Sequence, residues 1–341
     1  MSPPAPTEEQ VTEAVRDAVR RSGLFARDRP LVAMISGGRD STCLLDVAVS
    51  LLGPRAVMAM HVNYGLRHAA DADAERCRGL CAELGVELTL IETPRNSGDS
   101  AEPAPGEEGG GNLQAWARDV RYGEAHDLAR RHDALIAAGH TASDQVETVL
   151  YRLAASPGRR ALLGMAPVEG RLIRPLLGVT REQTTAYCLA RSLEYTDDQS
   201  NTDERFARTR VRHGLLEALR SVHPAAEANV LRTAMLLREE TELLEELVNR
   251  ELDGRSSVPL SRLREMPDAL ARLVVIRLAE QAVGGYVPQA GGRVEELLAL
   301  GRRGGRAELH VGGQAGAVIE DGQLRMVRLP PRSEKLTPDG D

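Results

Sequence analysis

An apolar run that leads directly into a pair of glycines constrains this chain more than any other feature. Leu31 to Ile35 are all apolar, as in a strand buried on both faces of a parallel sheet. Two adjacent glycines let backbone N–H groups approach an anion, and the next helix would present its positive N-terminus there. We therefore expect a nucleotide-binding loop formed by Ser36, Gly37, Gly38, Arg39, Asp40 and Ser41.

This loop differs from a Walker A loop, which requires a lysine. The only lysine in the chain is Lys335, far from the loop in sequence. Backbone amides and the hydroxyls of Ser36 and Ser41 are sufficient for a pyrophosphate site. Asp40 would repel a phosphate unless it helps to hold Mg²⁺, so the loop also predicts that ion. The alternative is an ordinary strand–helix turn with an Asp or Ser cap.

Strand and helix patterns alternate through the first part of the chain. Further strands are expected at 56–62, 86–91 and 134–138, and helices at 11–22, 41–52, 71–84, 112–132 and 143–153. Thr180 with Gln183 forms a capping box for another helix. This alternation predicts an α/β fold with a doubly wound parallel sheet. Residues 93–111 interrupt it with a Gly-, Pro- and Ser-rich stretch, which predicts a mobile surface loop.

The pattern changes after residue 215. Helices are expected at 227–252, 259–283 and 294–300, followed by strands that begin at 307. We therefore divide the chain into an α/β domain at 1–215, a mainly helical domain with a small β element at 216–328, and a disordered tail at 329–341.

The composition excludes several classes of protein. No run of 18 or more apolar residues occurs, which argues against a membrane helix, and the polar N-terminus argues against a secretion signal. The four cysteines form no disulfide or metal pattern, so a cytoplasmic protein is expected. The net charge is −7, but residues 152–220 contain 12 Arg and 8 acidic residues, so a local basic face is compatible with nucleic acid.

Two further segments, HVNYGLR and ARDVRY, carry polar side chains at or near predicted sheet edges. HVNYGLR places His61, Asn63 and Arg67 after the second strand, where ligands bind in open α/β sheets. ARDVRY places Arg118 and Arg121 on a helix, and an arginine there suits a phosphate. The alternatives are a polar capping loop in the first case and a solvated arginine face in the second.

The segment GHTASDQVET follows the strand at 134–138. Its His140, Asp144 and Glu147 are spaced to share one face if the segment is helical. Two carboxylates and an imidazole suit Mg²⁺ binding or proton transfer. The alternative is helix capping by Ser143 and Asp144 with a packed histidine.

These segments together resemble one family. SGGRDS resembles the loop of the PP-loop ATP pyrophosphatases, which cleave ATP to AMP and pyrophosphate. HVNYGLR, ARDVRY, GHTASDQVET, RPLL at 174–177, and the DQSNTD and RTRVR segments resemble strings of the tRNA(Ile)-lysidine synthases, in the family's order over residues 31–220. The chain departs from that pattern at Tyr64, Thr141, Ser143 and Thr209.

The resemblance implies a ligase. ATP would adenylate C2 of the wobble cytidine of an isoleucine tRNA with a CAU anticodon, and L-lysine would then displace AMP to form lysidine. It further implies ATP bound by residues 36–41 and His61, and Mg²⁺ on Asp40 and Asp144.

The remaining site residues receive roles on the same basis. Arg118 and His140 would contact the α-phosphate, and Glu147 would orient lysine or accept its proton. The residues expected to contact tRNA are Asn63, Arg67, Arg121, Arg208 and Arg212.

Two alternatives remain open within this resemblance. A tRNA thiolase would need catalytic cysteines, and no CxxC pair is present. A tRNA-binding protein could hold ATP as a structural ligand only. The oligomeric state stays open between a monomer and a homodimer.

Overall fold

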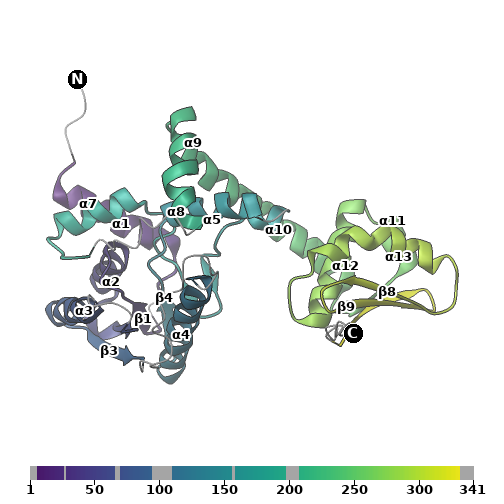
Figure 1. Ribbon diagram of the computed structural model, residues 1–341, viewed down its shortest axis with the longest axis horizontal. Coiled ribbons are helices and arrows are strands. Elements are labelled where there is room, and N and C mark those ends of the chain that lie inside the picture. Colours follow the sequence, from purple (N-terminus) through teal and green to yellow (C-terminus); the bar gives the residue numbers. More distant parts are fainter. Residues whose placement is uncertain are drawn as a thin grey trace, which may run out of the picture. The chain divides into compact units, whose positions relative to one another are not determined.

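The structure is a computed structural model that divides into two compact units, Met1–Met235 and Leu236–Asp341 (Figure 1). The residues it describes are 6–26, 28–65, 70–93, 110–155, 158–196 and 207–330. The side chains of 110–114 and 208 also fall outside the description.

The first unit contains a six-stranded sheet with the order β3-β2-β1-β4-β6-β5. Its strands are β1 (Leu31–Met34), β2 (Val57–Asn63), β3 (Glu87–Glu92), β4 (Leu135–Ala137), β5 (Val168–Glu169) and β6 (Leu172–Ile173). All neighbouring pairs are parallel except the edge pair β5 and β6. The expected doubly wound sheet is confirmed. The antiparallel edge hairpin was not predicted, because strands of two residues carry no periodic signal.

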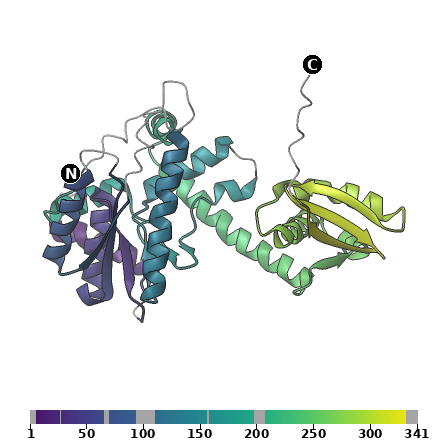
Figure 2. The same cartoon turned by 60° about the horizontal axis from the view of Figure 1, so that its bottom comes forward.

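Helices cover both faces of this sheet (Figure 2). The helices of this unit that precede α10 are α1 (Glu8–Ser22), α2 (Arg39–Leu52), α3 (Ala70–Leu84), α4 (Gly110–Arg131), α5 (Ala142–Ala155), α6 (Arg159–Leu162), α7 (Arg181–Ala190), α8 (Ala207–Arg210) and α9 (Leu216–Val222). Residues of α1, α2, α3 and α7 pack on one face of the sheet, and residues of α4 pack on the other.

Strand β1 shows why the apolar run is continuous. Leu31 and Ala33 face the cluster formed with α1, α2, α3 and α7, whereas Val32 and Met34 face α4. All four are at most 7% exposed. A strand covered on both faces needs apolar residues at every position. Burying each larger side chain contributes about 1.5–3 kcal/mol, which fixes the strand that precedes the glycine loop.

The boundary between the two units lies within α10 (Ala226–Leu252). The sequence placed it at residue 215, but the structure places it after residue 235. Val211, Leu216 and Leu231 pack against Val146 and Leu150 of α5, so this stretch belongs to the first unit. A π-helix at Val211–Leu215 joins α8 to α9 there. The predicted boundary was too early because it was based on local composition, which does not reveal a contact with the distant helix α5.

The second unit combines helices with a four-stranded antiparallel sheet of order β7-β10-β9-β8. Its further elements are β7 (Ser257–Pro259), α11 (Leu260–Glu265), α12 (Asp268–Val283), α13 (Val294–Gly301), β8 (Ala307–Gly312), β9 (Ala315–Glu320) and β10 (Gln323–Arg328). The helical character and the β element are confirmed. The helix expected at 259–283 is two helices, because the chain is extended at Met266 and Pro267.

None of the helices in the described residues is both long enough and apolar enough to cross a bilayer.

Candidate active site

The glycine loop connects β1 to α2 with its own hydrogen bonds. Gly37 has φ +76°, a left-handed conformation that glycine adopts without strain. The Ser41 hydroxyl donates to the Gly38 carbonyl at 2.8 Å and accepts from the Ser36 N–H at 3.1 Å. Gly38 is the N-cap residue of α2 and provides no side-chain cap. The positive end of the helix therefore faces the glycine loop, where an anion would be stabilised.

A distant segment holds this loop in place. The Thr196 N–H donates to the Gly37 carbonyl at 2.9 Å. The Thr196 hydroxyl donates to Asp73 Oδ1 at 3.1 Å and accepts from Arg76 Nε at 2.9 Å. This support was not predictable from local sequence patterns, because these partners are more than 100 positions apart.

The glycine loop and the GHTASDQVET segment meet at Gly139. A Cβ at Gly139 would lie 3.1 Å from the carbonyl carbon and oxygen of Asp40 and 3.2 Å from the amide nitrogen of Ser41. Such distances are tighter than most contacts of a Cβ with backbone atoms, so a side chain here would force the Asp40 backbone to shift by a few tenths of an ångström. Glycine at this position therefore lets the end of β4 approach the start of α2, which brings two predicted motifs together.

The two carboxylates predicted to hold Mg²⁺ lie at the starts of α2 and α5. Asp40 Oδ1 accepts from the Thr184 hydroxyl at 2.5 Å and from Arg39 Nε at 3.2 Å. Asp144 Oδ1 accepts from Arg181 Nη2 at 3.1 Å. Arg181 and Thr184 both belong to α7, so one helix supplies a partner to each carboxylate.

Arg181 is a central residue that the sequence did not single out. Burial alone would lower the pKa of its guanidinium, but the charges of Asp144, Glu147 and Asp40 outweigh burial and raise it. Arg181 thus contacts Asp144 and Glu147 directly, and the charge of Asp40 also stabilises its cation. In the sequence, Arg181 only follows the capping residue Thr180, whose capping box is confirmed.

Glu147 is 2% exposed and bound by two arginines. Its oxygens accept from Arg212 Nε at 2.6 Å and Arg212 Nη2 at 3.1 Å, and from Arg181 Nη1 at 3.3 Å. A carboxylate held this way orients cations and is poorly placed to take a proton from a substrate. The guanidinium of Arg212, a residue expected to contact tRNA phosphates, donates to Glu147.

The cap of α5 includes Asp144, as in the capping alternative, but its partner is Thr141 and not Ser143. Asp144 Oδ2 accepts from the Thr141 N–H at 2.8 Å and from its hydroxyl at 2.9 Å, while the Asp144 N–H points back to that hydroxyl at 3.4 Å. Thr141 and Asp144 thus form the cap, and the Ser143 hydroxyl accepts from the Arg181 N–H at 3.2 Å. The threonine that departs from the family pattern serves as the helix cap.

His140 follows β4 and is affected electrostatically by Asp144 and by three arginines. Burial lowers its pKa to about 4; Asp144 opposes this shift, and Arg174, Arg118 and Arg121 add to it. Its Nδ1 is buried without a hydrogen-bond partner among the described residues. The imidazole is therefore neutral near pH 7.

In the HVNYGLR segment, the described side chains of His61 and Asn63 make hydrogen bonds within the protein, although they were expected to contact ATP and tRNA. His61 is 6% exposed, and its Nδ1 lies 3.0 Å from the Ile35 carbonyl, which ties β2 to β1. Asn63 donates to Asp71 Oδ1 at 3.0 Å and accepts from the Gly65 N–H at 2.9 Å. Arg67 and the side chain of Arg208 lie outside the described residues.

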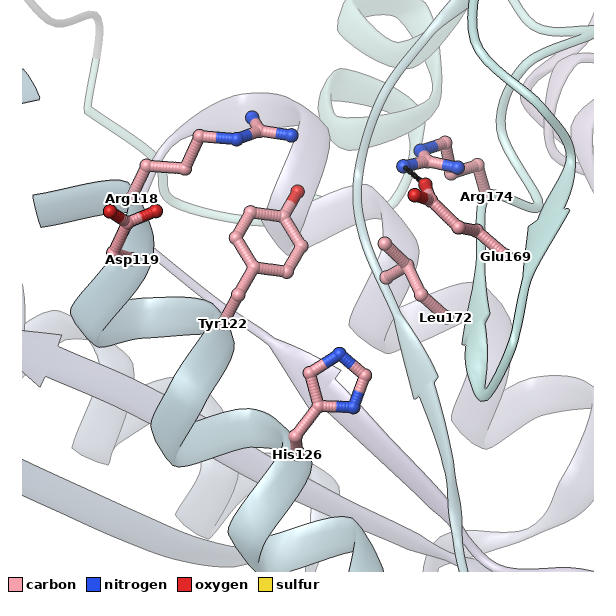
Figure 3. Close-up of a pocket in the computed structure, with 7 residues that line it drawn as sticks. All are labelled: Arg118, Asp119, Tyr122, His126, Glu169, Leu172 and Arg174. Carbon is pink, nitrogen blue, oxygen red and sulfur yellow. Dashed lines mark hydrogen bonds and ion pairs between the residues drawn. The ribbon is translucent and has the colours of Figure 1, made fainter. Parts of the chain in front are cut away.

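Arg118 belongs to a cavity of about 240 Å³ between α4 and the β5–β6 hairpin (Figure 3). The cavity is lined by Arg118, Asp119, Tyr122, His126, Glu169, Leu172 and Arg174. The Arg118 guanidinium carbon lies 4.6 Å from the centre of the Tyr122 ring, and that of Arg121 lies 5.6 Å from it. The sequence indicated the two arginines on α4 but not the hairpin opposite them.

The donor set at Asp40 and Asp144 suits Mg²⁺ only together with phosphates. Within the described residues, no group of three or more His, Cys, Asp or Glu side chains could hold a metal. Mg²⁺ is commonly held by one or two carboxylates, with phosphates and water completing the shell. The Asp40 carboxylate keeps Oδ2 outside the contacts with Thr184 and Arg39, so Asp40 fits this role directly.

Comparison with known proteins shows which family this chain resembles. The PP-loop domain model matches residues 6–219. A tRNA(Ile)-lysidine synthase of Pseudomonas fluorescens is 37% identical over 65% of this chain and 49% of its own length. A tRNA(Ile)-lysidine synthase of Symbiobacterium thermophilum is 35% identical over 94% of this chain and 70% of its own length.

A solved structure shares the fold. The U34-tRNA thiolase NcsA from Methanococcus maripaludis superposes with a TM-score of 0.56 at 16% identity, over 68% of this chain and 80% of its own. The chain spans about half the length of several curated relatives it matches.

Proposed function

The chain belongs to the PP-loop family and, within it, to the tRNA(Ile)-lysidine synthases, and on this premise we propose that it joins L-lysine to the wobble cytidine of an isoleucine tRNA with a CAU anticodon. One observation carries the proposal most directly. The glycine loop and the GHTASDQVET segment, separate in sequence, meet where Gly139 approaches the start of α2. An anion-binding helix end therefore lies beside carboxylates and a neutral imidazole.

The first step of the proposed reaction is adenylation of the base. The C2 oxygen of cytidine attacks the α-phosphorus of ATP, a P–O bond forms, and pyrophosphate leaves. The uncapped amides at the start of α2 bind phosphate oxygens, and the hydroxyls of Ser36 and Ser41 line that loop. Arg118 and His140 keep their proposed place near the α-phosphate, where the neutral imidazole would donate a hydrogen bond without adding charge.

Asp40 and Asp144 would hold Mg²⁺ together with the nucleotide phosphates. Bound there, the ion would neutralise charge on the leaving pyrophosphate. Asp144 now pairs with Arg181, so this role requires that Arg181 share or release the carboxylate. We assign Arg181 the task of balancing both carboxylates before ATP arrives.

The second step is displacement of AMP. The lysine side-chain amine attacks C2 of the base, a C–N bond forms, the C2–O bond breaks, and the oxygen leaves with AMP. The nitrogen must lose its proton. Glu147 is bound by two arginines, so we assign it to positioning and not to proton transfer. Water must be kept from the activated base, which would otherwise revert to cytidine.

The roles proposed for tRNA contact are retained in part. Asn63 and Arg121 lie in the first unit near the strand ends and on α4. The reaction needs the cytidine to leave the anticodon stack, as other base-modifying enzymes require. We place the reaction in the cytoplasm, where tRNA and ATP are available.

The cysteines argue against the thiolase alternative. Cys43, Cys77, Cys81 and Cys188 are all buried. Burial raises the pKa of Cys81 to about 11, so its thiolate is scarce near neutral pH. A thiolating enzyme would need an accessible thiolate or a cluster site.

Release of labelled pyrophosphate from ATP tests the proposal. Isoleucine tRNA with a CAU anticodon is compared with methionine tRNA that has the same anticodon, each with and without lysine. We expect release with the isoleucine tRNA only, and lysine attached to that tRNA. Release that ignores the tRNA, or a requirement for a sulfur donor, would contradict the proposal.

A further inference from the structure

We infer that Asp46 is a positioning residue for nucleotide binding: it fixes helix α7, and α7 in turn places Thr184 and Arg181 against the carboxylates of the site. The inference rests on the proposed function, because it concerns the Mg²⁺–ATP that the reaction consumes. It is supported by the burial of Asp46, by its partners on α7 and by the contacts of α7 with the site.

Asp46 is a buried carboxylate to which the proposed reaction assigns no role. It lies in the interior of α2, further along the helix than Asp40, and is 1% exposed. A carboxylate is seldom buried this completely unless charged partners and several donors satisfy it. The groups that surround Asp46 therefore determine whether its charge is tolerated.

The partners of Asp46 come from the C-terminal end of α7. The Tyr187 hydroxyl donates to Asp46 Oδ2 at 2.6 Å. Arg191, the C-cap residue of α7, donates from Nε to Oδ2 at 3.2 Å and from Nη2 to Oδ1 at 3.2 Å. Such a two-pronged arginine contact fixes direction as well as distance. Asp46 therefore restricts both the rotation of α7 and its position along α2.

Tyr187 makes this contact from inside the core. It is 0% exposed and belongs to the cluster that joins α1, α2 and α7, three helices that lie side by side in Figure 1. The guanidinium carbon of Arg16 on α1 lies 5.9 Å from the centre of its ring. Burial raises the pKa of the Tyr187 hydroxyl, and Asp46 raises it further. The hydroxyl therefore keeps its proton and donates to the carboxylate.

The face of α7 that holds Asp46 also reaches the start of α2. Helical spacing places on this one face Thr184, Tyr187, Cys188 and Arg191. The Thr184 hydroxyl donates to Asp40 Oδ1 at 2.5 Å, and Cys188 Sγ donates to the carbonyl of the first residue of α2 at 3.6 Å. One helix face thus contacts α2 at the glycine loop and again at Asp46. A rotation of α7 that breaks one contact would disturb the other.

The first residue of α7 extends this effect to the remaining carboxylates. Arg181 forms ion pairs with Asp144 at 3.1 Å and with Glu147 at 3.3 Å. Arg181 must share or release Asp144 when Mg²⁺–ATP binds, so its position affects the affinity for the nucleotide. Asp46 acts on this step through α7, because a packed helix moves as a unit.

The alternative is that Asp46 serves stability alone. Loss of a purely structural contact would lower the free energy of unfolding and the fraction of folded protein. It would leave unchanged the Kd for Mg²⁺–ATP of the molecules that remain folded. A positioning role predicts that this Kd rises, so the Kd separates the two roles.

Calorimetric titration of the full chain with Mg²⁺–ATP tests the inference, without requiring the complete reaction. The variants are Asp46→Asn and Tyr187→Phe, and circular dichroism establishes that each is folded. Tyr187→Phe keeps the ion pair between Asp46 and Arg191, so it is expected to fold even if Asp46→Asn does not. The matched control is Val57→Ala, which removes buried atoms from the same core at the start of β2.

We expect the Kd for Mg²⁺–ATP to rise about tenfold in Asp46→Asn, a typical size for residues that act through packed elements. Tyr187→Phe should raise it about threefold, because one hydrogen bond is lost. Val57→Ala should stay within about twofold of the wild type. In the double variant Asp46→Asn with Thr184→Val, the Kd should be at most about twice that of the weaker-binding single variant, because both changes act on the same helix.

Three results would contradict the accounts above in different ways. A wild-type Kd in both Asp46→Asn and Tyr187→Phe, or in Tyr187→Phe alone where Asp46→Asn does not fold, would refute the positioning role. Factors that multiply in the double variant would refute action through α7. No pyrophosphate release by the wild type with isoleucine tRNA, together with the expected changes of Kd, would refute the proposed function and leave the inference about Asp46 intact.

Discussion

Replacement of Glu147 by glutamine tests whether this carboxylate positions arginines. The change keeps the size of the side chain and removes its charge. Glu147 accepts three guanidinium N–H bonds, at 2.6, 3.1 and 3.3 Å, and is 2% exposed. In the variant, Arg212 and Arg181 lose their shared counter-charge, and the new amide group presents its own donors to them.

The magnitude follows from the burial of each partner. Breaking a fully buried ion pair costs about 3–5 kcal/mol. The side chains of Arg181 and Arg212 remain 22% and 23% exposed, so water compensates part of the loss. We therefore expect the free energy of unfolding of the first unit to fall by about 2–3 kcal/mol.

Urea unfolding followed by tryptophan fluorescence measures this change in the right unit. Trp116 is the only tryptophan, lies on α4 and contacts Tyr64, so its signal reports on the first unit. The control is Asp127→Asn, which breaks an exposed pair with Arg130 on the same helix and should cost at most about 1 kcal/mol.

The activity of the same variant separates the two roles of Glu147. A positioning role predicts that pyrophosphate release and lysine transfer both decrease, because Arg181 also contacts Asp144. Unchanged stability and pyrophosphate release, with loss of lysine transfer alone, would refute the positioning role and restore Glu147 as a proton acceptor.

Three further substitutions test other parts of the site. Gly139→Ala places a Cβ 3.1 Å from the Asp40 backbone, so it should cost about 1–3 kcal/mol and raise the KM for ATP in the pyrophosphate assay; a wild-type KM would contradict the close approach. Thr184→Val removes the 2.5 Å hydrogen bond to Asp40 and should lower stability by about 1.5–3 kcal/mol in urea unfolding, whereas Thr184→Ser should retain most of it; equal loss in both would refute the role of that hydroxyl. His140 has a folded pKa of about 4, below the unfolded value near 6.5, so the unfolded chain binds more protons between these values. Wild-type stability should therefore fall by about 3 kcal/mol more than that of His140→Asn from pH 6.5 to 4, and parallel pH profiles would contradict the shift.

The sequence predicted the elements that local patterns determine. The structure confirms three local features: the apolar run at Leu31, the glycine pair and the capping box at Thr180. Each of them depends only on residues that are close together in sequence. Gly139 was included in a motif, but its close contact with Asp40 depends on two loops that approach each other in space.

The parts that the sequence did not predict depend on long-range pairing. Thr196 reaches the glycine loop, and Arg181 reaches Asp144 and Glu147, across distances in sequence that no periodicity bridges. Arg212 was expected to contact tRNA because the RTRVR segment resembles a family string and places Arg208 and Arg212 on one helix face. Its ion pair with buried Glu147 depends on the packing of α5 against the π-helix, which the sequence does not show.

The most direct test of the account follows the C2 oxygen of the base. Isoleucine tRNA with a CAU anticodon, labelled with ¹⁸O at C2 of the wobble cytidine, is incubated with the protein, ATP and ¹⁵N-lysine, and the products are analysed by mass spectrometry. The account predicts that ¹⁸O appears in AMP and that the nucleoside gains ¹⁵N. Unlabelled AMP with an unchanged cytidine would mean that ATP is cleaved without activation of the base, and would contradict the central claim.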